Sequence, residues 1–222
     1  MAAVVQTFTA NALPAGFGKE GTVRFPKKFK WSNRDAANGT NVAPGAIVLP
    51  QTSDRFCLID GPDNNGAGSR TMAGVDMFPP AGAGHYVNHG DGTYTRAVVG
   101  STLHWGNVVI PPGGKLQFHW IFLRGQQSGQ FNAFAQFRAV EPNGSEALRR
   151  TFAQSMDPGG GESGAFYRWR AHELIEFPQG FGGTLQWIVA QGERVGGPNA
   201  PVNANARLHP AGLALDFISI IT

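Results

Sequence analysis

The chain has 222 residues, of which 41% are hydrophobic, so it can bury a sizeable core. Charged residues make up only 15%, against about 25% in an average soluble domain, and the formal net charge is +3. This mild positive charge permits an acidic partner without requiring one. The single cysteine, Cys57, excludes an internal disulfide, and no run approaches the ~18 apolar residues of a membrane-spanning helix.

Segments of alternating apolar and polar residues follow one another along the chain, separated by Gly and Pro turns, which is typical of β-strands. The first, Thr22–Trp31, sets aromatic residues on one face and basic residues on the other, and Pro26 places it at a sheet edge or a bulge. One segment, Ser145–Gln154, is predicted as a helix because Leu148 and Phe152 lie four residues apart. Further strands are predicted at Gly45–Leu49, Arg55–Asp60, Thr93–Val99, Leu103–Ile110, Leu116–Phe122, Phe131–Val140, Ala165–Phe177, Thr184–Ala190 and Leu213–Ile221.

Many short strands with little helix predict an all-β fold, an antiparallel, jelly-roll-like β-sandwich that spans residues 1–222 as one domain. The alternation is clearest in Leu116–Phe122, and it predicts that Trp120 points into the core. Asp216 is out of phase with its apolar neighbours in the last strand, so we predict that it points outward or into a polar network. Two long loops are predicted, at Gly61–Gly74 and Gly192–Pro210.

Motifs that would indicate catalysis are missing from the sequence: it has no nucleophile elbow, no Walker A motif, no H-E-x-x-H and no Cys/His zinc pattern. Gly159–Gly164 matches G-x-G-x-x-G, but no apolar strand precedes it, so we interpret it as a hairpin loop. We interpret His85, His89 and Asp91 as a polar turn rather than as metal ligands. The sequence therefore predicts no enzyme activity, no cofactor and no metal.

Basic residues gather near the N-terminus, where Lys19, Arg24, Lys27, Lys28 and Lys30 interleave with aromatic residues. Such a stretch fits contact with a polyanion or with single-stranded nucleic acid, through charge and base stacking. The alternative is an edge strand whose lysines prevent edge-to-edge pairing. The alternation puts the charges and the aromatic rings on opposite faces, which suits that alternative.

Four aromatic residues are candidates for stacking on the apolar face of a ligand such as a sugar. The alternative is packing in the core, which is the commoner position of such side chains. The four residues are Trp31, Tyr86, Tyr94 and Trp105.

Three segments in the second half of the chain carry a resemblance to a known family: Gly114–Leu123, Phe131–Ala135 and Ala211–Ile218. With them, residues 113–222 resemble the β-sandwich domains of bacterial surface proteins in the choice-of-anchor or PEP-CTERM-associated group. The family usually has an acidic residue where Ala133 stands and Asn where Phe217 stands. The resemblance implies a jelly-roll-like sandwich and a non-catalytic role at a surface or in a matrix, and it carries over no functional residue.

Two functions follow from these patterns. The first is a non-enzymatic structural or assembly protein, a jelly-roll-like subunit of a particle, fibre or surface layer, including a phage or viral capsid. Its partners would be further copies of the chain, to form a homo-oligomer, and nucleic acid. The alternative is a glycan-binding module of an exported bacterial surface protein. No signal peptide is visible, and we expect a virion, extracellular or cell-surface location without membrane insertion.

Overall fold

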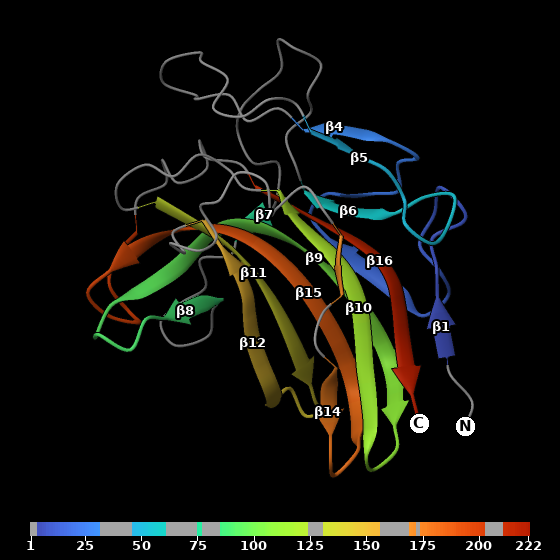
Figure 1. The fold of residues 1–222 in the computed structure, drawn as a ribbon. Helices are drawn as coiled ribbons and strands as arrows, with labels where there is room; N and C mark the ends of the chain where they lie inside the picture. The colour runs from blue at the N-terminus through green and yellow to red at the C-terminus, as the bar shows by residue number, and fades with distance from the viewer. Residues whose placement is uncertain are drawn as a thin grey trace.

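The computed structural model describes residues 4–31, 46–60, 75–76, 85–123, 131–155, 169–171, 174–202 and 211–222. Every regular element in these ranges is a β-strand, and all strand pairs are antiparallel. Figure 1 shows two large sheets packed face to face, with a small β4–β5 hairpin to one side. The predicted antiparallel β-sandwich is therefore confirmed. No helix in the described ranges could cross a membrane.

The first sheet is centred on the pair β10 (Gly114–Leu123) and β16 (Gly212–Ile221). β6 and β3 continue the sheet beyond β16, while β13 and β14 pair with the other edge of β10, and β1 pairs with β16. The bounds of these shorter strands are β1 Val4–Gln6, β3 Val23–Arg24, β6 Cys57–Asp60, β13 Arg170–Ala171 and β14 Ile175–Phe177.

The second sheet is centred on two long strands, β9 (Tyr94–Ile110) and β15 (Phe181–Val195). β11 (Phe131–Val140) pairs with β15, and β12 (Glu146–Gln154) forms the edge beyond it. Three short strands share the opposite edge of β9. They are β2 Phe17–Glu20, β7 Val75–Asp76 and β8 Tyr86–Asn88.

The core lies between the two sheets and follows the period-2 alternation of their strands. On β10, Leu116, Phe118, Trp120 and Phe122 all enter this core, so the predicted inward face of Trp120 is confirmed. The ring of Trp187 on β15 meets Phe118 edge to face, with their centroids 5.6 Å apart. Aromatic contacts of this kind lock the two sheets in one relative position.

The segment predicted as a helix is the strand β12, and that prediction was wrong. Residues four apart share a face in a strand as well as in a helix, so the spacing of Leu148 and Phe152 did not discriminate. Both side chains pack against the core as parts of a strand. A tight turn decides the outcome: Gly144 has a φ of 86°, and Gly144 N donates to Glu141 O at 2.9 Å, which turns the chain back along β11.

The predicted strand Thr22–Trp31 is two strands in different sheets: β3, and β4 (Phe29–Trp31), which pairs with β5 (Ala46–Val48). Pro26 interrupts the segment because it cannot donate to a ladder, and its carbonyl instead accepts from Phe56 N at 3.2 Å. Phe25 enters the main core, whereas Phe29 packs on the outer face of the first sheet. The prediction that the aromatic residues of this segment share one face was therefore also wrong.

Other boundaries differ in length. The strands predicted at Thr93–Val99 and Leu103–Ile110 are one continuous strand, β9, since residues 100–102 keep their pairing with β15. β15 runs to Val195, so the predicted loop at Gly192–Pro210 begins later, and residues 203–210 lie outside the described residues. The loop predicted at Gly61–Gly74 lies wholly outside them. Within Ala165–Phe177, the structure describes two short strands, β13 and β14.

Candidate ligand-binding face

The outer face of the second sheet carries a small apolar cluster of its own. Val87 on β8 packs there with Ala97, Phe134, Ile188 and Ala190. A main-chain bond from Ala97 N to His85 O, at 3.0 Å, holds the start of β8 beside β9. The long strands of this sheet bend at the end where β8 lies (Figure 1). β8 thus covers part of the outer face and bounds the rest of it.

Beside this cluster, a row of polar side chains crosses four neighbouring strands. The register places Arg149 (β12) opposite Arg138 (β11), Arg138 opposite Gln186 (β15), and Gln186 opposite His104 (β9). All four residues are half-buried. Since adjacent strands lie about 4.8 Å apart, the row is about 14 Å long. We call these four residues the polar row.

Gly18 on β2 continues this line past His104. A Cβ atom at Gly18 would lie 2.1 Å from Nε2 of His104, so the imidazole occupies space that only a glycine leaves free. The orientation of His104 therefore depends on its neighbour across the strands as well as on its own strand.

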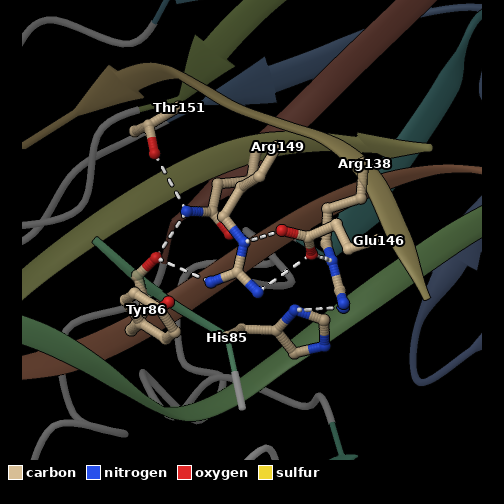
Figure 2. Close-up of polar contacts among 7 residues, drawn as sticks. His85, Tyr86, Arg138, Glu146, Arg149 and Thr151 are labelled. Carbon is tan, nitrogen blue, oxygen red and sulfur yellow. Dashed lines mark hydrogen bonds and ion pairs between the residues drawn. The ribbon is translucent and has the colours of Figure 1, made fainter. Parts of the chain in front are cut away.

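One end of the polar row is an ion-pair network that Figure 2 shows in detail. Glu146 accepts from Nε of Arg138 at 2.5 Å and from Nε and Nη2 of Arg149 at 2.8 and 2.9 Å. Nη1 of Arg138 donates to Nδ1 of His85 at 3.3 Å. The side chains of Arg138, Arg149 and Glu146 are 19%, 20% and 26% exposed, so the network is partly buried and solvent still reaches it.

The network carries one net positive charge. Burial and the neighbouring guanidinium groups of Arg138 and Arg149 lower the pKa of His85 to about 4, so its ring is neutral near pH 7. Hydrogen bonds from the two arginines hold the pKa of Glu146 below its usual value although burial opposes them, so this carboxylate is ionised. Two positive charges therefore meet one negative charge.

Two aromatic rings flank the network. The guanidinium carbon of Arg149 lies 4.3 Å from the ring centroid of Tyr86, which is a cation–π contact. Tyr94 meets Tyr86 edge to face, with centroids 5.8 Å apart, and both residues are half-buried. Two of the four predicted stacking residues are therefore neighbours on this face.

Backbone and amide contacts fix the position of Tyr86. Nε2 of Gln136 donates to Tyr86 O at 2.6 Å and to Oγ1 of Thr151 at 2.9 Å, which joins β8 to β11 and β12 (Figure 2). Oε1 of Gln136 is buried, and none of the described residues donates a hydrogen bond to it. Further along the face, Nδ2 of Asn132 donates to Oγ1 of Thr95 at 3.0 Å. The aromatic pair thus sits on a framework of buried side-chain amides.

The other predicted stacking residues lie elsewhere. Trp105 is only 8% exposed and stacks on Phe17 in the core, with centroids 5.1 Å apart, so the prediction that it stacks on a ligand was wrong. Its alternation places it with Leu103 on the inner face of β9, and the aromatic character of the residue does not reveal this. Trp31 belongs to β4, but its side chain lies outside the described residues.

The predicted basic residues lie on β2, β3 and β4 and in the connection between β3 and β4. Lys19 is exposed on β2, where its Nζ donates to Val23 O at 3.4 Å, and Arg24 is half-buried over the ring of Phe29. Lys27 and Lys28 are exposed in the connection between β3 and β4, and the side chain of Lys30 lies outside the described residues. Contact with nucleic acid stays a prediction.

The three residues interpreted as a polar turn, His85, His89 and Asp91, each contact a different partner. His89 Nε2 lies 2.8 Å from Oγ1 of Thr95, and Asp91 forms an ion pair with Arg194 at 2.6 Å. His85 belongs to the ion-pair network. Across the part of the chain that the structure describes, no group of three or more His, Cys, Asp or Glu side chains could hold a metal ion.

A pocket lies at the hairpin end of the sandwich, with a volume of about 860 Å³. Its walls are largely apolar and come from three hairpins, including Pro111, Leu148 and Phe181. It contains two carboxylates, but Glu176 pairs with Lys115 at 2.6 Å and Glu141 accepts from Oγ of Ser145 at 2.6 Å. Both carboxylates therefore have a polar partner nearby, Lys115 on the neighbouring strand β10 for Glu176 and Ser145 in the β11–β12 turn for Glu141.

Most of this candidate face was not predicted from the sequence. Arg138, Arg149, Gln186 and His104 come from four separate strands, and only the register of the second sheet aligns them. One signal was present: these residues fall on the alternate positions of strands whose other positions are apolar. Reading it required β12 to be a strand rather than a helix.

No protein-family model matches the chain, and a comparison with curated proteins found no match. Among solved structures, the chain is similar to the K1 cleaved adhesin domain of Lys-gingipain from Porphyromonas gingivalis W83. The identity is 12% and the TM-score 0.43, over 99% of this chain and 98% of that one.

Two carbohydrate-binding modules give lower scores. TmCBM61, solved with β-1,4-galactotriose, has 9% identity and a TM-score of 0.38 over 94% of this chain and 90% of that one. The CBM22-1 xylan-binding domain of Xyn10C from Paenibacillus barcinonensis has 8% identity and a TM-score of 0.35, over 98% and 92%. Identities and TM-scores this low leave the function to be inferred from the residues of this chain.

Proposed function

We propose that this chain is a non-catalytic glycan-binding module and that the outer face of its second sheet is the binding surface. The observation that carries the proposal is the polar row, which offers guanidinium, amide and imidazole groups along one line across four strands. It ends beside the Tyr86–Tyr94 pair. Sugars present hydroxyl groups at their edges and C–H groups on their faces, so they need both kinds of partner.

The dimensions of the row suit a linear oligosaccharide. Its length of about 14 Å corresponds to about three sugar rings laid across the strands. Planar side chains such as Arg138 and Gln186 can each form two hydrogen bonds with neighbouring hydroxyl groups. The strands hold these side chains in position before a ligand arrives, which lowers the entropy cost of binding.

The experiment compares two matched glutamine variants. Gln186→Ala removes an amide from the middle of the polar row, whereas Gln179→Ala removes one from an exposed turn at the hairpin end. Both proteins are run by affinity electrophoresis in gels that contain neutral and acidic polysaccharides, after their melting temperatures have been compared. We expect retardation of the wild type and of Gln179→Ala, and clearly reduced retardation of Gln186→Ala. Equal retardation of the two variants would contradict the proposal that the outer face of the second sheet is the binding surface.

The assembly role is the second candidate, and it stays a prediction. A homo-oligomer would be detected as a discrete mass well above 23.6 kDa in light scattering coupled to size exclusion. A monomer would be consistent with the binding module. Nucleic acid that elutes with the protein and is released at high salt would instead favour the basic residues near the N-terminus.

A further inference from the structure

We infer that the ligand of this face is an acidic glycan and that Arg138, in the ion-pair network, binds a sugar carboxylate. This inference rests on the proposed function and gives the class of glycan. It concerns the end of the polar row where Arg138, Arg149, Glu146 and His85 meet.

The ion-pair network carries an excess positive charge. Two guanidinium groups share one carboxylate, and both arginines are about four-fifths buried. Among the described residues, Glu146 is the carboxylate that pairs with these guanidinium groups. A largely buried positive charge without a full counter-charge is costly, and an anion offsets that cost. One carboxylate per binding site neutralises the network, whereas a neutral sugar leaves it as it is.

The two arginines differ in how many of their N–H groups already have a hydrogen-bond partner. Arg149 directs Nε and Nη2 to Glu146 and Nη1 toward Tyr86 O, at 3.5 Å, so all three of its nitrogens have partners. Arg138 uses Nε for Glu146 and Nη1 for His85. Among the described residues, none accepts a hydrogen bond from Nη2 of Arg138. The guanidinium that adjoins Gln186 in the polar row is therefore the one with donors to spare.

The shape and charge of a guanidinium group suit an oxygen-bearing anion. A guanidinium presents parallel N–H groups that match the two oxygens of a carboxylate, and such charge-assisted bonds are stronger than bonds between neutral groups. A single carboxylate also carries the one negative charge that the network lacks. Both matches favour an acidic sugar over a neutral one; a sulfate monoester also carries one negative charge, so a sulfated sugar is the comparison that tests the carboxylate assignment.

Among the described residues, Glu20 is a further charge on this sheet, and it lies too far away to cancel the effect. Glu20 is on β2, where it pairs with Thr102 of β9, and it is exposed at the far edge of the sheet. Three strand spacings, about 14 Å, separate that edge from the strand of Arg138, which exceeds the screening length of about 8 Å at physiological salt.

The test uses ligands that differ only in charge. Trigalacturonate and its fully methyl-esterified form have the same sugar backbone, and a glucuronate-bearing xylo-oligosaccharide with its methyl ester gives a second pair. Binding to the full chain is measured by isothermal titration calorimetry at low and physiological salt. We expect at least one of the acids to bind roughly tenfold or more tightly than its ester, with the difference shrinking as salt rises.

Two variants move the charge in opposite directions. Arg138→Gln removes the charge and should reduce the advantage of the acid over the ester to about twofold or less. Glu146→Gln keeps an amide oxygen as an acceptor for the arginines but raises the net charge of the network, so it should increase the preference for the acid over the ester several-fold by strengthening acid binding. Because a misfolded protein does not gain affinity, the second variant separates the inference from a loss of structure.

Equal binding of acid and ester, reduced by Gln186→Ala in both cases, would overturn the acidic ligand while leaving glycan binding on this face intact. Sulfated trisaccharide binding as tightly as the uronate would overturn the carboxylate assignment. If no glycan binds the wild-type chain in any of these assays, the proposed function itself fails.

Discussion

Asp216 joins the last strand of the first sheet to the segment before β6, and its removal should destabilise the protein strongly. It lies in β16 and is fully buried. Its Oδ2 accepts from the main-chain N–H groups of Gln51 and Thr52, both at 2.9 Å, and its Oδ1 accepts from Phe217 N at 2.9 Å. The alternative in which Asp216 enters a polar network is thereby confirmed.

The size of the effect follows from these contacts. Oγ of Ser53 gives a fourth hydrogen bond, to Oδ1 at 3.3 Å. Each hydrogen bond to a charged group contributes about 1.5–3 kcal/mol, but four bonds to one carboxylate do not add fully. Gln51 and Thr52 are exposed residues, so water can replace part of what their amides lose. We therefore expect Asp216→Ala to lower the free energy of unfolding by about 2–4 kcal/mol, and Asp216→Asn by about half as much because one acceptor oxygen remains.

The assay is urea unfolding of wild type, Asp216→Ala and a matched control, Asp54→Ala, in which the same substitution falls on an exposed residue. The control should stay within about 0.5 kcal/mol of wild type. Hydrogen exchange at the amides of Gln51 and Thr52 should accelerate in Asp216→Ala alone. If Asp216→Ala unfolds within 1 kcal/mol of wild type at an unchanged m-value, roughly the scatter of such measurements, the hydrogen bonds do not stabilise the fold as reasoned.

Three further predictions concern the core, a tight contact and the ion-pair network. Trp120→Ala should cost about 3–5 kcal/mol in chemical unfolding, since its ring is buried against Phe152 with centroids 5.0 Å apart; an unchanged melting temperature would contradict its inward orientation. Gly183→Ala should destabilise β15, because φ is 156° and a Cβ would lie 2.2 Å from Val140 O; a melting temperature at or above that of wild type would refute the crowding. The pKa of His85 is lowered from 6.5 to about 4 in the folded protein. Between pH 6.5 and pH 4 the unfolded chain therefore binds a proton that the folded protein does not bind, so the stability of the fold decreases as the pH drops from 7 to 5. His85→Gln should lose about 1–2 kcal/mol less than wild type between pH 7 and 5, and equal losses in the two proteins would show that His85 is not the group responsible.

The sandwich could be predicted from the sequence because its central strands alternate cleanly. Leu116–Phe122 and Phe131–Val140 carry an apolar residue at every second position, and the pattern alone identifies their inner faces. Prediction failed at Leu148 and Phe152, because residues four apart share a face both in a helix and in a strand. It also failed in the basic segment Thr22–Trp31, which Pro26 divides into two strands. In both places a single turn or a missing N–H decides the structure, and neither changes the average composition of the segment.

The candidate binding face could be predicted only in part. Tyr86 and Tyr94 are close in sequence and were candidates on their chemistry, and they do meet. The polar row depends on long-range register: Arg138 and Gln186 are 48 positions apart, and Gln186 and His104 are 82 apart. Inner and outer positions of one strand are distinguished by alternation, but which strand lies beside which is set by how the sheets pack.

The most direct test of glycan binding at the outer face of the second sheet is a nuclear magnetic resonance titration. The isotope-labelled chain is titrated with an oligosaccharide that retards it in affinity electrophoresis. Glycan binding at the outer face of the second sheet predicts that saturable shift changes centre on the side-chain N–H groups of Arg138 and Gln186 and on the ring of His104. They should extend to Tyr86 and leave the hairpin-end pocket and Lys27–Lys28 unchanged. Saturable changes centred on that pocket or on the basic segment, with the polar row unaffected, would contradict it.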